Sequence, residues 1–190
     1  MSISLKKGGR INLSKEAPSL DNMTVGLGWD ANISDTGSDA DLDVSIFLVN
    51  AQGKTSNDKD FIFYNNLTST DGSVVHTGDN LTGEGDGDDE KIKVSLSKVS
   101  DTVQEIIFVV TIHEAETRKQ NFGQVSNSFI RIVDDSNGNE VLKYELDEDY
   151  SSETAIEFGK LYRRDNSWRF QAVGTGFNSG LQSFVDKYIG

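Results

Sequence analysis

The chain has 190 residues, of which 35% are hydrophobic, and its 31 acidic and 18 basic residues give a net charge of −13 at pH 7. This length suffices for one domain with a substantial core, whereas the negative charge disfavours a main role in binding nucleic acid or an anionic membrane. The chain has no Cys, which excludes disulfides, thiolate zinc sites and a Cys nucleophile.

The first residues, 1–9, are too polar for the apolar core of a signal peptide, and no run of eighteen apolar residues occurs. We therefore expect a soluble cytoplasmic protein without a transmembrane segment. No repeat or low-complexity linker divides the sequence, so residues 1–190 are expected to form a single domain.

Short alternating segments rich in Val, Ile, Phe and Tyr, bounded by Gly, Asn, Asp or Ser, predict nine β-strands. In chain order these are Met23–Trp29, Val44–Asn50, Phe61–Tyr64, Ile92–Leu96, Glu105–Ile112, Ser128–Val133, Glu140–Leu146, Ile156–Arg163 and Ser167–Val173. So many short strands predict an all-β fold, namely an antiparallel β-sandwich with one or two short peripheral helices.

Two further features refine this map. Residues 106–112 are apolar on both faces, which predicts a central strand covered on both sides. The turns at 136–139 and 165–166 use residues that tolerate positive φ, so each is expected to close a hairpin.

Helical patterns occur in two places. Residues 113–122 predict a short surface helix with a Glu114 to Arg118 pair and Gly123 as its cap. Residues 180–188 predict a second helix, because Leu181, Phe184 and Tyr188 fall on one face.

Twelve of the acidic residues lie in two stretches, 30–43 and 71–90, that contain no Lys or Arg. Two carboxylates about 4 Å apart repel by roughly 4 kcal/mol at an effective dielectric near 20, so a packed cluster costs stability unless a cation or protons neutralise it. Both stretches connect predicted strands and can meet at one end of a sandwich. The glycines allow tight backbone turns, and Asn65 and Asn66 add amide oxygens near the second stretch.

Oxygen donors of this kind, completed by backbone carbonyls, suit the six-to-eight-oxygen shell of Ca²⁺ better than Mg²⁺, zinc or copper. The supply of carboxylates suffices for two Ca²⁺ ions. Neither stretch fits an EF-hand, because Val44 occupies the position of the required Gly. An acidic run can also be a solvated surface loop, but the Gly spacing, the flanking strands and the interleaved Asn favour an ordered site.

Several segments resemble motifs of the TerD family, and the resemblance covers nearly the whole chain. The motifs are Gly26-Leu-Gly-Trp-Asp30, Asp41-Leu-Asp43, Asp60-Phe-Ile-Phe-Tyr-Asn-Asn66, Asp71-Gly-Ser-Val and Gly78-Asp-Asn-Leu-Thr-Gly-Glu-Gly-Asp-Gly-Asp-Asp-Glu90. The resemblance implies a bacterial cytoplasmic calcium-binding β-sandwich linked to tellurite resistance and to general stress, phage or colicin resistance.

The pattern and the resemblance together define one set of candidate metal ligands. It comprises Asp30, Asp41, Leu42, Asp43, Asn65, Asn66, Asp71, Asp79, Asp86, Asp88, Asp89 and Glu90. Asp35 and Asp39 lie in a segment that resembles a variable insert and are not included.

Two functional hypotheses follow from this site. The preferred one is a binding or scaffold module without catalytic activity, whose partners are other proteins of a resistance system, including membrane-associated ones. The alternative is a metal-dependent enzyme acting on phosphate esters or nucleotides, with His76 as general acid or base. Direct reduction of tellurite is not expected, because it needs electrons and the chain has neither Cys nor a recognisable redox-cofactor motif.

One basic and aromatic hairpin stands out in this acidic chain. Lys160, Arg163, Arg164 and Arg169 are interleaved with Tyr162, Trp168 and Phe170. The pattern is typical of a hairpin with one buried and one solvated face, and it also suits a surface that docks an acidic protein.

Overall fold

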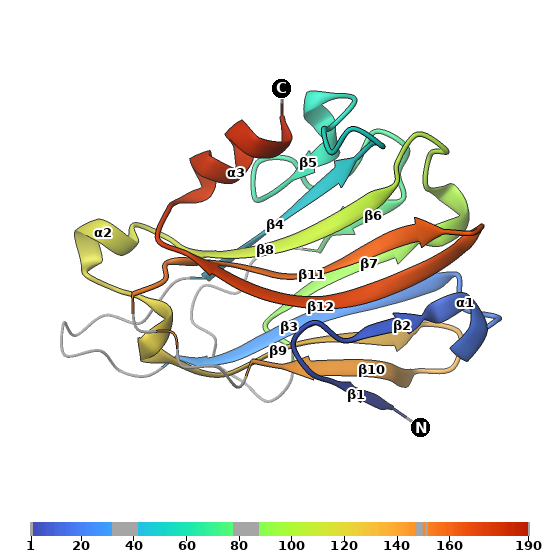
Figure 1. Cartoon of the computed structure of the whole chain (residues 1–190), viewed down its shortest axis with the longest axis horizontal. Helices are drawn as coiled ribbons and strands as arrows, with labels where there is room; N and C mark the ends of the chain where they lie inside the picture. The colour runs from blue at the N-terminus through green and yellow to red at the C-terminus, as the bar shows by residue number, and fades with distance from the viewer. Residues whose placement is uncertain (1, 32–41, 78–87, 147–149, 151, 190) are drawn as a thin grey trace.

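Two β-sheets face each other in the computed structural model (Figure 1), which describes every residue except 1, 32–41, 78–87, 147–149, 151 and 190. One sheet, here called sheet A, has the strand order β1-β10-β9-β3-β7-β6, and the other, sheet B, has the order β2-β12-β11-β8-β4-β5. Sheet A consists of β1 (Ile3–Leu5), β10 (Asn139–Glu145), β9 (Val125–Asp134), β3 (Asn22–Ala31), β7 (Glu90–Ser95) and β6 (Val74–His76). Sheet B consists of β2 (Arg10–Asn12), β12 (Ser167–Phe177), β11 (Ala155–Arg164), β8 (Glu105–Ile112), β4 (Leu42–Val49) and β5 (Phe61–Ile62).

Helices contribute little to the described part of the chain. The α-helices are α1 (Leu13–Glu16), α2 (Ala115–Arg118) and α3 (Leu181–Tyr188), and single 3-10 turns cover Asp58–Asp60, Leu96–Lys98 and Phe122–Gln124. None of the helices in the described residues is long and apolar enough to cross a membrane.

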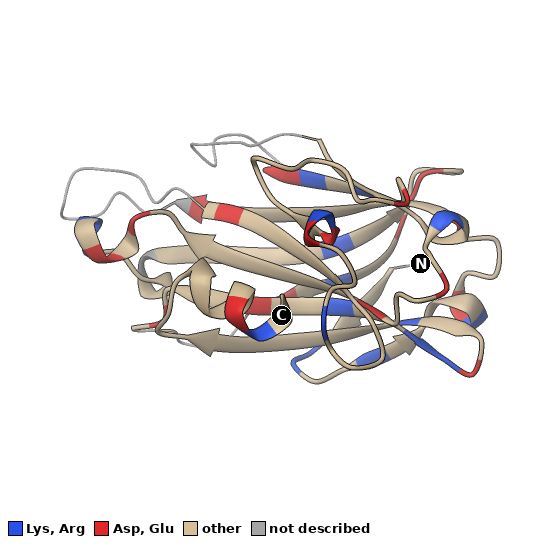
Figure 2. Cartoon of the chain, turned by 90° about the horizontal axis from the view of Figure 1, so that it is seen from above, with Lys and Arg blue, Asp and Glu red and all other residues tan. Residues whose placement is uncertain are grey.

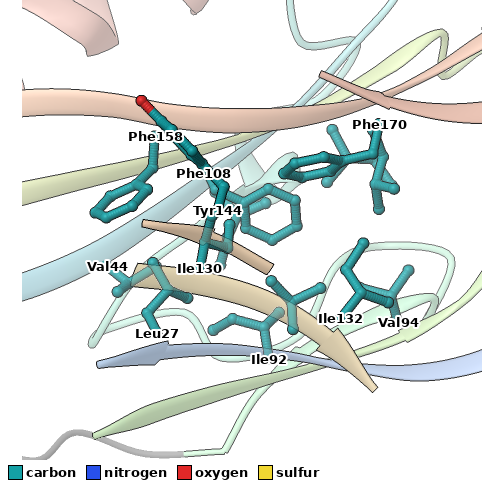
Figure 3. Packing of buried hydrophobic residues seen from close by; sticks show 14 of the residues in the cluster. Leu27, Val44, Ile92, Val94, Phe108, Ile130, Ile132, Tyr144, Phe158 and Phe170 are labelled. Carbon is teal, nitrogen blue, oxygen red and sulfur yellow. The ribbon is translucent and has the colours of Figure 1, made fainter. Parts of the chain in front are cut away.

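The core lies between the sheets because alternate residues of each strand point to the same face. Ile106, Phe108 and Val110 of β8 point inward, where they join Leu27, Ile92 and Ile130 of sheet A. Figure 3 shows Leu27, Ile92, Phe108 and Ile130 packed together with Tyr144, Phe158 and Phe170. This packing fixes which residues of each strand face outward, and therefore where the polar groups lie.

The outer face of sheet B carries a second apolar cluster under α3. Phe184 and Tyr188 of the helix pack on outward-facing residues such as Phe47 and Val109. Burial, and then the neighbouring Glu157 carboxylate, raise the pKa of Tyr188, and its hydroxyl donates to Glu157 Oε1 at 2.9 Å. Helix α3 therefore covers the part of this face formed by β4, β8 and the first residues of β11.

All nine predicted strands are present, and the sandwich is antiparallel except for the parallel pairing of β1 with β10. The strand predicted over Phe61–Tyr64 was too long, because β5 ends at Ile62 and the chain then turns back so that Phe63 pairs with Asn66. Strand β8 is central in sheet B, as predicted, and both hairpins are present. Asp165 and Asn166 both have positive φ, 52° and 60°. The short strands β1, β2 and β6 were not predicted, because three residues are too few to establish an alternating pattern.

The prediction of one helix over 113–122 was wrong in extent. Helix α2 covers only Ala115–Arg118 and ends at Lys119, which adopts the left-handed conformation with φ 56°. Gly123 therefore does not cap it and lies instead in a separate 3-10 turn. The expected pair is present, since Arg118 Nε lies 3.6 Å from Glu114 Oε2.

Candidate metal centre

Residues that flank the two acidic stretches meet at one end of the sandwich. Leu27 near the end of β3 pairs with Glu90 at the start of β7, and the amide of Asp89 donates to the carbonyl of Leu27 at 2.8 Å. Strand β4 begins at the same end, because the amide of Val44 donates to Glu90 Oε2 at 3.2 Å. In Figure 2, acidic segments lie next to points where the grey traces join the strands.

Asp88 lies on the outer face of sheet A, where Arg131 binds its carboxylate. Arg131 Nε donates to Oδ1 at 2.8 Å and Nη2 to Oδ2 at 2.9 Å, and the Asp88 side chain is only 2% exposed. Arg131 lies opposite Gly26 in the sheet, and a Cβ on Gly26 would collide with the Asp88 carboxylate. This bidentate pair already compensates the charge of Asp88, so the carboxylate has a structural role in the described residues.

Asp89 faces the end of β3, where the pairing with β9 is interrupted between Gly28 and Asp30. Its Oδ2 accepts a hydrogen bond from the amide of Trp29 at 2.8 Å. Burial raises the pKa of Asp89, the nearby charges of Asp30 and Asp88 raise it further, and the bond from Trp29 acts in the opposite direction. Like charges therefore crowd at this point of the sandwich.

Glu90 points between the sheets and connects them. Its Oε2 accepts the Val44 amide of sheet B and lies 3.2 Å from Nε2 of His76 on β6 of sheet A. The side chains of Glu90 and His76 are 0% and 3% exposed. His76 is thus a buried partner of Glu90.

Two further predicted ligands, Asp30 and Asp43, lie at this end of the sandwich. Asp30 is exposed, and its Oδ2 accepts a hydrogen bond from Asn127 Nδ2 at 2.6 Å. Asp43 shares the outer face of sheet B with Phe47, and its Oδ2 lies 3.8 Å from Nδ1 of His113. Leu42 is the first residue of β4, beside Asp43.

The structure holds three other predicted ligands in turns. Asn66 donates through Nδ2 to the carbonyls of Lys59 and Phe61, and it closes a tight turn that contains the exposed Asn65. Asp71 precedes β6 and accepts hydrogen bonds from Ser69, Ser73 and the amide of Ser100. Asp71 lies before β6 and His76 at its far end, so the strand separates Asp71 from Glu90.

Asp41, Asp79 and Asp86 lie outside the described residues, as do Asp35 and Asp39. Within the described ranges, no three His, Asp or Glu side chains form a group that could hold a metal ion. Asp30, Asp43, Asp89 and Glu90 nevertheless offer carboxylate oxygens around one end of the sandwich, and such donors fit a hard cation such as Ca²⁺. The donor type of these residues fits calcium, but the described residues alone do not form a complete site.

Three residues with a role at this end were not predicted from the sequence. Gly26 provides the space for Asp88, Arg131 binds it, and the backbone of Trp29 binds Asp89. The alternating Ile130-Arg131-Ile132 pattern places Arg131 on the outer face, but nothing in the sequence pairs it with a residue 43 positions away.

Comparisons with known proteins show close similarity over nearly the full length. A family model described as the TerD domain matches residues 1–188. The chain is 60% identical to the tellurium resistance protein TerD of Serratia marcescens over 188 residues, which cover 99% of this chain and 97% of the relative. It is 53% identical to general stress protein 16U of Bacillus subtilis over 188 residues, with 99% and 97% coverage.

The fold is also similar to a solved structure. The crystal structure of a homologue of telluride resistance protein (TerD) from Streptomyces coelicolor gives a TM-score of 0.69 at 23% identity. The match covers 87% of this chain and 95% of that one, and it supports the two-sheet architecture.

We expect Asp71→Asn to destabilise the protein independently of calcium. Burial acts to raise the pKa of Asp71, but hydrogen bonds from Ser73, Ser100 and Ser69 outweigh it and lower the pKa below 3.8. The carboxylate therefore contributes stability that is present above the unfolded-state pKa and lost as the pH falls through the lower folded-state pKa. Urea unfolding at pH 7 should show a loss of about 1–2 kcal/mol that shrinks below about pH 4.

The loss should be equal in calcium and in a chelator, and Asp58→Asn, at an exposed position, should change little. A loss seen only with calcium would instead make Asp71 a calcium ligand.

Proposed function

Because the chain belongs to the TerD family, we propose that it acts in tellurium resistance and the general stress response as a calcium-binding module. Support for the biological role comes from relatives at 60% and 53% identity that are named for tellurium resistance and for general stress. The matched region extends over 188 residues in both cases, so it spans both acidic stretches.

The observation that carries calcium binding is the crowding of carboxylates at one end of the sandwich. Asp89 is buried, and the neighbouring charges of Asp30 and Asp88 act to raise its pKa. A divalent cation near Asp30 and Asp89 would relieve this repulsion. In this proposal Asp30, Asp43, Asp89 and Glu90 hold two calcium ions together with Asp41, Asp79 and Asp86.

Calcium in this position has a structural consequence. The acidic stretches join β3 to β4 and β6 to β7, so an ion that binds both stretches connects sheet B to sheet A at the end where Glu90 already connects them. At a hundred times its dissociation constant, a ligand that binds only the folded state adds roughly 2.7 kcal/mol of stability. This gain is a large fraction of the free energy of unfolding that is usual for a single domain.

The proposed contribution to resistance is indirect. The chain has no Cys to reduce tellurite. His76, the candidate general base, is 3% exposed and lies against Glu90, so a substrate has little access to it. We therefore propose a scaffold or binding role, in which the calcium-loaded end presents an ordered surface to other proteins of the resistance system.

Calcium should change the fluorescence of one of the two tryptophans. Trp29 is 4% exposed and its amide binds Asp89, whereas Trp168 lies on the hairpin at the opposite end. Titration with Ca²⁺ should change the emission of the wild type and of Trp168→Phe, but not that of Trp29→Phe. Calorimetry should detect calcium binding in all three proteins, with a smaller response to Mg²⁺.

The control for this titration is the thermal melt. Calcium should raise the melting temperature of all three proteins, because it binds only the folded state. If calcium produces neither heat nor a rise in melting temperature, the chain does not bind calcium at this end.

The link to resistance can be tested in cells that lack the gene. Wild-type protein should raise survival on tellurite, and Asp30→Asn combined with Asp43→Asn should abolish this gain at equal protein levels, because two ligand charges are lost. The matched control is Asp58→Asn with Asp186→Asn, which removes the same charge from exposed sites elsewhere. Equal survival with both double variants would show that resistance does not depend on the calcium site.

A further inference from the structure

The outer face of sheet B is covered on only one half. Helix α3 lies over β4, β8 and the first residues of β11, while β2, the second half of β11 and the first half of β12 continue beyond it (Figure 1). The inward residues of these strands, such as Ile11, Leu161 and Phe170, belong to the core. Their neighbours in each strand therefore point outward, to the side that α3 does not cover.

Basic residues gather on this uncovered half. Tyr162 pairs with Arg169, which pairs in turn with Asn12, and Lys160 pairs with Gln171, which pairs with Arg10. Residues directly opposite each other in a sheet share a face. The outward set is here called the basic face and comprises Arg10, Lys160, Tyr162, Arg164 and Arg169.

Most of these charges have no acidic partner. Lys160 Nζ lies 3.0 Å from Glu105 Oε1, but within the described residues no carboxylate lies within 4.0 Å of the guanidinium groups of Arg10, Arg164 and Arg169. Arg10 and Arg164 are exposed, and Arg169 is half-buried with its Nε donating to Ser167 Oγ at 3.3 Å. In a chain of net charge −13, three uncompensated arginines on one face form a local positive surface.

We propose that the basic face docks a short acidic segment of a partner protein. Each guanidinium can bind a carboxylate in a bidentate manner. Alternate residues of an extended peptide lie about 6.6 Å apart on one side, which is the spacing of alternate residues such as Lys160 and Tyr162 along β11. Glu or Asp at every second position of the segment would thus meet successive basic side chains.

The hairpin tip provides a neighbouring hollow for such a segment. A pocket of about 470 Å³ is lined by Arg163, Arg164, Ser167 and Trp168, together with Asp101 and Asp165, so its basic side is the one formed by the arginines. The guanidinium of Arg163 lies 4.6 Å from the centre of the Trp168 ring and donates to the carbonyls of Val99 and Ser100. The tip is therefore a fixed platform at the edge of the basic face.

Charge distribution favours a short acidic segment over a long polyanion. Strand β11 has ten residues, or about 33 Å, and it separates the hairpin tip from the acidic end by several times the Debye length of about 8 Å. A short segment bound at the basic face is screened from the acidic end. Nucleic acid or an anionic membrane would extend over the rest of the negative molecule.

The test uses fluorescein-labelled octaglutamate and fluorescence anisotropy at low and physiological salt, with octaglutamine as the uncharged control. The wild type should bind octaglutamate and not octaglutamine. Arg164→Glu with Arg169→Glu should weaken binding by at least about tenfold, and the corresponding Gln variants by less. The matched control is Lys59→Glu with Lys91→Glu, which changes net charge equally at exposed sites elsewhere and should change affinity by less than about threefold.

Circular dichroism should show that both double variants are folded, because all four positions are at least partly exposed. Equal weakening by both pairs would overturn the proposal. Tighter binding of duplex DNA or of phosphatidylserine vesicles through the same arginines would assign the face to a polyanion instead. Self-association that Arg164→Glu with Arg169→Glu abolishes would assign it to a second copy of this chain.

Discussion

Three consecutive carboxylates at the start of β7 constrain this end of the sandwich. The side chains of Asp88 and Glu90 are 2% and 0% exposed, and Asp89 is buried, so each charge must be compensated. Asp88 and Asp89 precede the regular strand, and the three residues meet different surroundings: Asp88 binds Arg131 on the outer face, Asp89 accepts the Trp29 amide, and Glu90 lies between the sheets. The pairing of β7 with β3 and the contact with β4 both depend on this arrangement.

The acidic residues of this region differ in how their charges are compensated. Arg131 compensates Asp88, and hydrogen bonds from serines compensate Asp71, so both carboxylates have fixed protein partners. Asp30 and Asp89 lie together where burial and like charges raise the pKa of Asp89. Carboxylates in this second situation gain most from a cation. The basic face lies elsewhere, on the outer side of sheet B, where Glu105 pairs with Lys160.

Much of the fold could be predicted from the sequence, because the long strands alternate clearly and the hairpin turns contain residues suited to positive φ. The candidate site was less predictable, since an acidic residue looks the same in a sequence whether it binds an ion or a protein group. Asp71 and Asn66 match the expected ligand types, but their partners are turn amides and carbonyls. The roles of Gly26 and Arg131 around Asp88 depend on the strand register, which places the two residues opposite each other.

Backbone amide NMR with and without Ca²⁺ tests the central claim most directly, namely that calcium binds at the end formed by β3, β4 and β7. The amides of Trp29 and Val44, which bind Asp89 and Glu90, should shift with calcium. The amides of Ser73 and Ser100, which bind Asp71, should not. Shifts confined to Ser73 and Ser100, or no shifts at all, would contradict the account.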